Sequence, residues 1–190
     1  MLVVLVLCGI AYVAALGVFA PWAFYMGGKF HITPYWQGWG RAHTANGDYL
    51  IYVLISPSSN SSKMYLSTSV AGRVNVCTPR GENLALKMRG GMRKHLNLST
   101  DGESIWLGMH RMSWRQFNGD YSPSLELRGH WQNPNLVMDD EGSIAKAFRP
   151  DGTPYGAHDR NRSPSKEVVP ITLIEGTYTD YRTACNAMSR

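Results

Sequence analysis

Histidine and carboxylate side chains are the groups of this 190-residue chain that could carry out acid–base or metal chemistry. The six histidines form neither an HExxH motif nor a pair four residues apart in a helical pattern. On paired strands, His95 and His110 could lie close together, and His130 could join them from a third strand. Three converging imidazoles would suit a metal ion, whereas the simpler interpretation is a polar sheet face with exposed histidines.

Carboxylates gather in one run, Asp139, Asp140 and Glu141, which Gly142 follows. The run could hold calcium, but it lacks the alternating oxygen ligands of a calcium-binding loop, so a solvated hairpin turn is expected. The sequence also lacks a nucleophile elbow, a phosphate-binding loop and a dinucleotide-binding glycine pattern. We therefore predict no catalytic residue, no resident metal and no cofactor, and an enzyme is the less favoured interpretation.

The three cysteines fall in two settings. Cys8 lies in an apolar segment, where it would pack as a small hydrophobic side chain. Cys77 and Cys185 lie in the rest of the chain and could form a disulfide in an oxidising compartment, or remain two buried thiols. A disulfide would tie the carboxyl-terminal tail to the middle of the domain and would stabilise it by closing a long loop.

Residues 2–26 form an almost continuous apolar segment, and no charged side chain occurs in the first 28 residues. As a helix, the stretch before Pro21 would span about 28 Å, close to the thickness of a bilayer's hydrocarbon layer. Trp22 and Tyr25 follow at the expected level of the lipid headgroups. Small residues that permit close contact between helices are Gly9, Ala11, Ala14 and Gly17. We predict a retained transmembrane helix at residues 1–28; a cleaved secretory signal and a buried core helix are the alternatives.

The orientation of this segment follows from two opposing arguments. Lys29 and Arg41 come directly after it, which by the positive-inside rule would keep the remaining chain in the cytoplasm. Large domains, however, cross membranes largely regardless of their charge. The remaining chain is rich in Tyr, Trp, Ser, Asn and Gly and has 13 arginines but only six lysines. We expect it on the extracytoplasmic side of a cell membrane, in the periplasm or outside the cell.

Beyond residue 28, short apolar runs alternate with Gly, Asn, Asp and Pro every 8–12 residues or so, as is typical of antiparallel sandwiches and barrels. We predict an all-β domain at 29–148, a Pro- and Gly-rich surface loop at 149–166, and a strand followed by a short helix at 167–190. Thr177 and Asp180 have the spacing of a helix cap. The expected strands are 30–41, 48–56, 63–70, 73–77, 83–88, 92–99, 103–112, 123–131, 135–139, 143–148 and 168–175.

Two strands carry clear face patterns. Residues 49–55 are apolar at both odd and even positions, so both faces of a strand here would be apolar. This predicts a central strand covered on both faces. Leu125, Leu127 and Trp131 alternate with polar residues, which predicts one buried face.

Asp101 and Gly102 favour a two-residue type I′ turn. That turn would place Leu98 opposite Ile105 on an apolar face. The opposite face would present polar and aromatic residues, and it is the candidate surface for a partner. Its members are Arg93, His95, Trp106 and His110.

The net charge of +5, with basic residues clustered at 87–94, raises nucleic acid as a partner. No DNA- or RNA-binding motif is present, and extracytoplasmic placement argues against that partner. Anionic lipid headgroups, or an acidic face of a protein, use the same electrostatics.

The leading hypothesis is a non-catalytic accessory or scaffold subunit of a membrane protein complex, with membrane lipids and other subunits as its partners. The alternative is a membrane-tethered β module that binds a lipid, a pigment or a sugar. The triplet Gly38-Trp39-Gly40 is similar to the first strand of a lipocalin barrel, but the similarity covers only these few residues.

Overall fold

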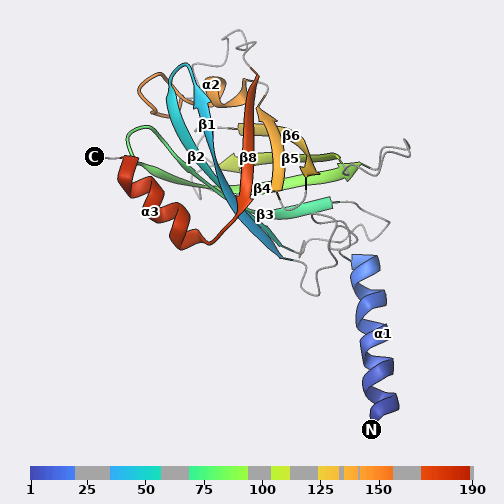
Figure 1. Cartoon of the computed structure of the whole chain (residues 1–190). Coiled ribbons are helices and arrows are strands. Elements are labelled where there is room, and N and C mark those ends of the chain that lie inside the picture. Colours follow the sequence, from blue (N-terminus) through green and yellow to red (C-terminus); the bar gives the residue numbers. More distant parts are fainter. Residues whose placement is uncertain are drawn as a thin grey trace, which may run out of the picture.

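The computed structural model describes residues 1–19, 35–56, 69–93, 104–111, 124–132, 135–140, 142–155 and 168–188. Within these residues the chain forms a closed antiparallel barrel of eight strands, and a helix lies near each end of the chain (Figure 1). The strands follow one another around the barrel in sequence order. The predicted all-β class and the carboxyl-terminal helix are confirmed. Of the two predicted architectures, a sandwich or a barrel, the structure shows the barrel.

The strands are β1 (Trp36–Thr44), β2 (Gly47–Ser56), β3 (Ser69–Cys77), β4 (Asn83–Arg93), β5 (Ser104–Arg111), β6 (Ser124–Gln132), β7 (Asn135–Asp140) and β8 (Val169–Glu175). The helices are α1 (Leu2–Phe19), α2 (Ser143–Ala147) and α3 (Tyr178–Met188).

The barrel closes where β1 pairs with β8, for example at Gly38 and Glu175. The two strands lie so close that a Cβ on Gly40 would be 2.2 Å from the carbonyl oxygen of Thr172. A side chain at this position would push the two backbones apart. The glycines at 38 and 40 therefore have a structural role, since they allow the sheet to curve onto itself.

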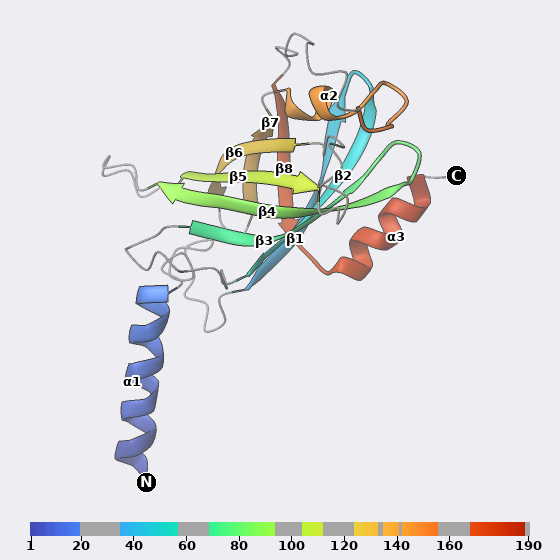
Figure 2. The same cartoon turned by 180° about the vertical axis from the view of Figure 1, so that it is seen from behind.

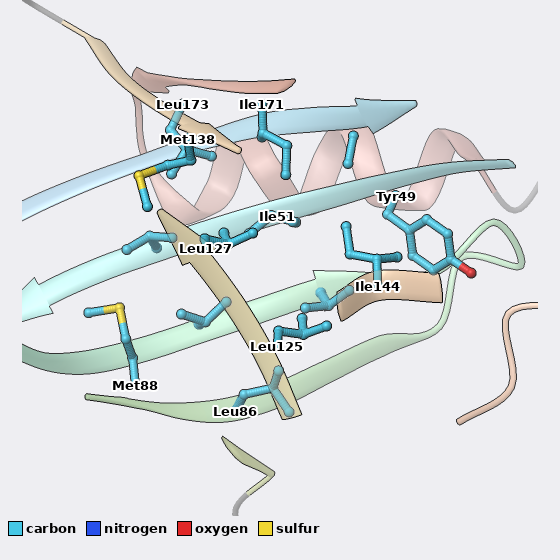
Figure 3. Packing of buried hydrophobic residues seen from close by; sticks show 14 of the residues in the cluster. Tyr49, Ile51, Leu86, Met88, Leu125, Leu127, Met138, Ile144, Ile171 and Leu173 are labelled. Carbon is cyan, nitrogen blue, oxygen red and sulfur yellow. The ribbon is translucent and has the colours of Figure 1, made fainter. Parts of the chain in front are cut away.

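Alternate residues along the strands point inward and form one apolar core (Figure 3). Aromatic contacts lie near its two ends. Trp36 is edge-on to Trp131 with ring centroids 5.2 Å apart, and Tyr49 packs against Phe148 at 5.3 Å. Eight strands enclose an interior just wide enough for side chains to fill, and these rings belong to the buried side chains that occupy it.

The predicted face patterns of β2 and β6 are confirmed. In β2, Tyr49 and Ile51 belong to the barrel core, whereas Leu50 lies beneath α3 on the outer face. In β6, Leu127 and Trp131 are buried, and the residues between them are partly or fully exposed.

The predicted turn at Asp101 and Gly102 does not set the register of β4 and β5. Met92 of β4 pairs with Ile105, in the position predicted for Leu98. The prediction is wrong because each strand of a closed barrel pairs with two neighbours, so the register depends on the whole sheet and not on one turn. Asp101, Gly102 and Leu98 themselves lie outside the described residues.

The expected strand 83–88 and the start of the expected strand 92–99 belong to one strand, β4, and residues 94–99 lie outside the described residues. β4 runs through Gly90 and Gly91, which pair with residues of β3 and β5. Glycine inside a strand permits a strong local bend, which suits a strand that curves around a small barrel.

The strand expected at 143–148 is helix α2 instead. Gly142 precedes it in the left-handed conformation with φ 75°, which turns the chain away from β7. Ile144, Ala147 and Phe148 are buried and belong to the barrel core, so α2 covers one end of the barrel. The prediction failed because an apolar run this short fits one helical turn as well as a strand.

Candidate interaction surfaces

Helix α1 lies apart from the barrel in both views (Figures 1 and 2). From Leu2 to Val13, its large apolar side chains keep between 43% and 77% of their surface exposed. The interpretation as a buried core helix is therefore wrong for the described residues. Among those residues, no helix combines the length and the hydropathy needed to cross a membrane.

Most of the predicted membrane-anchor residues can be placed on α1. Gly9, Ala11 and Ala14 lie in its exposed part, and Gly17 lies near its end. A Cβ on Gly9 would meet no other atom within 4 Å, so none of the residues that the structure describes covers that position. Trp22 and Tyr25 lie outside the described residues.

Helix α3 packs on the outer face of the barrel, over β1 and β2 (Figure 1). The contact contains a second apolar cluster, in which Leu50 and Tyr52 of β2 meet Tyr181 of α3. A disulfide between Cys77 and Cys185, whose Cα atoms are 5.7 Å apart, joins the end of β3 to α3. The helix is thus held by both apolar contact and a covalent bond.

Three tyrosines lie at this contact: Tyr52, Tyr178 and Tyr181, with ring centroids 5.2–5.8 Å apart. Tyr181 donates its hydroxyl hydrogen to Asn83 Oδ1 at 2.7 Å, and Tyr52 donates to Gln37 Oε1 at 2.7 Å. Burial raises the pKa of both of these hydroxyls, so they remain neutral donors near pH 7. The network fixes α3 in one orientation on the sheet.

The predicted cap of α3 is formed by Thr177 and Asp180. The Thr177 backbone N–H donates to Asp180 Oδ2 at 3.0 Å, and the Asp180 N–H donates to Thr177 Oγ1 at 3.2 Å. Two amides without helical partners are thereby satisfied by each other's side chains. The hydrogen bonds from Thr177 lower the pKa of Asp180.

Three of the four residues of the predicted partner surface lie at positions on the same side of the sheet. Arg93, Trp106 and His110 occupy register positions on the same side of the sheet as Lys87, whose side chain is exposed. The structure therefore puts these positions on the outer face of the barrel. His95 lies outside the described residues.

The histidines predicted to converge do not do so where the structure describes them. His130 pairs with Ser104 at one end of β5, and His110 pairs with Ser124 near the other end. Six residues of strand separate the two histidines, a distance of about 20 Å. Over the described ranges, no three His, Cys, Asp or Glu side chains are placed to hold a metal ion.

Asp140 is buried rather than part of a solvated turn, so that expectation is wrong for this residue. Its carboxylate accepts hydrogen bonds from the N–H groups of Ser143 at 2.8 Å and Ile144 at 3.1 Å, which are the first amides of α2. Ser143 Oγ also contacts this carboxylate and accepts a hydrogen bond from the Glu126 N–H at 3.0 Å. Asp140 therefore joins α2 to the barrel end.

The pKa of Asp140 is raised by burial, against the opposing effects of the hydrogen bonds from Ser143 and Ile144 and of nearby Lys146. A raised pKa means that the folded state binds the proton more tightly than the unfolded state. Stability from this group is therefore greatest at acidic pH and falls as pH rises through the raised pKa. The arrangement suits a structural cap and not a calcium ligand, because the buried oxygens already accept amide hydrogens.

Two polar atoms inside the barrel have no hydrogen-bond partner in the described structure: the Tyr49 hydroxyl and Trp131 Nε1. Burial raises the pKa of Tyr49 to about 12, with smaller contributions from Asp151 and Tyr155. These atoms lie toward opposite ends of the core, one on each of the aromatic contacts described above.

Two features were missed from the sequence. Asp140 stands three residues before the first residue of α2, but the acidic residues beside it favour a solvated turn, and no capping pattern marks the start of the helix. Tyr178 and Tyr181 stand three apart on one helix face, yet no local pattern links them to Tyr52, more than 120 positions away.

Comparison with known protein families, with curated proteins and with solved structures finds no significant match for this chain.

Proposed function

We propose that the chain is a non-catalytic accessory or scaffold subunit of a membrane protein complex. Residues 1–28 hold it in the bilayer as a single span, and the barrel braces neighbouring subunits on the extracytoplasmic side. The observation that carries this proposal is the exposed apolar surface of α1.

The sequence of α1 supports a lipid environment. Apolar residues occur on all sides of the helix, and no charged residue lies in its first or last turn. A helix that is apolar all round is stable either in a protein core or in lipid. The described part of the chain offers α1 no core, so lipid or the helices of other subunits are the remaining surroundings.

The disulfide supports the extracytoplasmic side. Cys77 and Cys185 are bonded in the structure, and structural disulfides persist mainly in oxidising compartments such as the periplasm and the cell exterior. Because this bond joins α3 to the end of β3, the barrel suits a compartment in which the bond is kept oxidised.

The alternative, a tethered ligand-binding barrel, has one observation in its favour. Trp131 Nε1 and the Tyr49 hydroxyl are buried without a described partner, and a ligand could supply one. The large rings that fill the core favour a packed interior, which is why the scaffold role is preferred.

Purification from native membranes in a mild detergent tests the scaffold role. We expect the chain to travel with other subunits in a particle much larger than its own 21.2 kDa. Gly9→Leu with Ala11→Leu should weaken that association, because large side chains keep helices apart. Val4→Leu is the matched control and should leave the particle intact. A wild-type chain that runs alone as a monomer would contradict the proposal.

A further inference from the structure

Outer positions of β3 and β4 carry basic residues, and no acidic residue stands at an outer position of β3, β4 or β5. The register places Arg73, Lys87, Arg89 and Arg93 at outer positions of β3 and β4. We call the positions of these four residues the basic face.

Two members of the basic face lie directly opposite each other. Arg73 pairs with Lys87 across β3 and β4, and both side chains are exposed. Like charges opposite each other on a sheet are destabilising, so the fold gains nothing from this pair. No carboxylate of the described residues lies within ion-pair distance of either one.

Three other exposed arginines have a carboxylate partner within the chain. Arg41 Nη1 lies 3.2 Å from Asp48 Oδ2, and Arg80 Nη2 lies 3.1 Å from Asp151 Oδ2. Arg128 also has a carboxylate partner. Arg73 and Lys87 have no such partner among the described residues, so their charges are available to an anionic group outside the chain.

We propose that the basic face binds anionic lipid headgroups at the surface of the membrane that holds α1. This inference rests on the proposed membrane anchor. In both views α1 lies on the side of the barrel toward which β3 and β4 extend (Figures 1 and 2). The connection from α1 to β1 spans residues 20–35, a length that can reach about 50 Å when extended. The basic face is therefore within reach of the bilayer surface.

Binding in this way would orient the barrel. Each Lys or Arg near an anionic surface strengthens attachment about fivefold, and the attraction fades within a Debye length. β8 lies opposite β4 in the closed order of strands, so its outer surface would face away from the membrane and remain open to a partner subunit.

Lysine footprinting of the full chain tests the inference, because the chain provides its own control. Lys87 belongs to the basic face, whereas Lys146 is exposed on α2 at the barrel end. The chain is placed in nanodiscs of phosphatidylcholine, with or without about a third of phosphatidylglycerol. Acetylation at each lysine is then measured by mass spectrometry.

We expect acetylation of Lys87 to fall about threefold or more in the anionic discs, with Lys146 unchanged and the effect reversed by high salt. Arg73→Glu should abolish the protection, whereas Arg128→Glu, which makes the same charge change on β6, should retain it. Equal acetylation of Lys87 in both kinds of disc would overturn the inference.

A second result would also overturn the inference: Lys87 is protected only when an acidic protein is added, whichever kind of disc is used. The basic face would then be assigned to that protein. Recovery of the chain with the discs is recorded separately. If the chain fails to stay with either kind of disc, the membrane anchor itself fails; if it stays and Lys87 is not protected, only the basic-face inference fails.

Discussion

Both terminal helices of this chain lie outside the barrel. α3 packs against the sheet, whereas α1 lies apart from it. Tyr181 and Cys185 of α3 are buried against the sheet, and a disulfide and a hydrogen-bonded cap hold the helix. Apolar side chains of α1 are exposed, and neither end of α1 carries a charged residue. A helix that packs on its own domain needs one apolar face, whereas a helix that is apolar all round requires apolar surroundings on every side, which the described part of this chain does not supply.

The largest contrast concerns the cysteines. Replacing Cys77 and Cys185 by serine should lower the free energy of unfolding by about 4 kcal/mol, because the disulfide closes a long loop in the unfolded chain. Cys8→Ser on α1 is the matched control and should leave stability unchanged, since Cys8 is a free, exposed cysteine. Denaturant unfolding of the barrel measures both. Equal stability of the double variant and the wild type would show that α3 does not depend on its covalent link.

Truncation of buried and exposed side chains sharpens the comparison. Tyr181→Ala should destabilise the chain by about 3 kcal/mol, because a fully buried ring is removed from the α3 contact. Tyr181→Phe removes only the hydrogen bond to Asn83 and should cost about 1 kcal/mol.

Val6→Ala on α1 is the control for these variants. It should not change barrel unfolding, because the Val6 side chain is exposed. A loss comparable to that of Tyr181→Ala would mean that α1 packs on the barrel after all.

A smaller effect is expected from the cap. Thr177→Ala should cost about 1 kcal/mol, because the two hydrogen bonds that the Thr177 hydroxyl makes with the side chain and the backbone N–H of Asp180 are lost. Thr179→Ala, one residue inside the helix and exposed, should stay within about 0.5 kcal/mol of the wild type. Hydrogen exchange of the α3 amides reports the difference locally. Identical protection in both variants would argue against the cap.

The smallest effect is a pH dependence confined to α3. The pKa of Asp180 is lowered in the folded state, so its contribution is present above the unfolded value of 3.8 and is lost as pH falls through the folded pKa. Exchange of α3 amides should therefore accelerate in acid, below about pH 4. Asp180→Asn should reduce this acid sensitivity. α1 contains no carboxylate and should show no such change.

The sequence predicted those parts of the fold that depend on local patterns. Apolar residues at both parities identified β2 as a covered strand, and the spacing of Thr177 and Asp180 identified the start of α3. Cys77 and Cys185 were named as a possible pair because only two cysteines lie outside the apolar segment.

Features that depend on the closed sheet could not be predicted. The register of β4 and β5 is fixed by pairing around the whole barrel, so the strong turn signal at Asp101 and Gly102 was misleading. The burial of Asp140 follows from its inward position on β7, which the acidic run concealed. The residues of the basic face could be placed together only once the register between β3 and β4 was known.

Alkaline extraction of membranes that contain the full chain tests the central claim, that residues 1–28 hold it in lipid. We predict that the chain stays in the membrane pellet after high-pH and high-salt washing and that only detergent releases it. Val6→Arg with Ile10→Arg should move it to the soluble fraction, because charge within a bilayer is costly. Release of the wild-type chain without detergent, or a mature chain that begins after Gly17, would contradict the account.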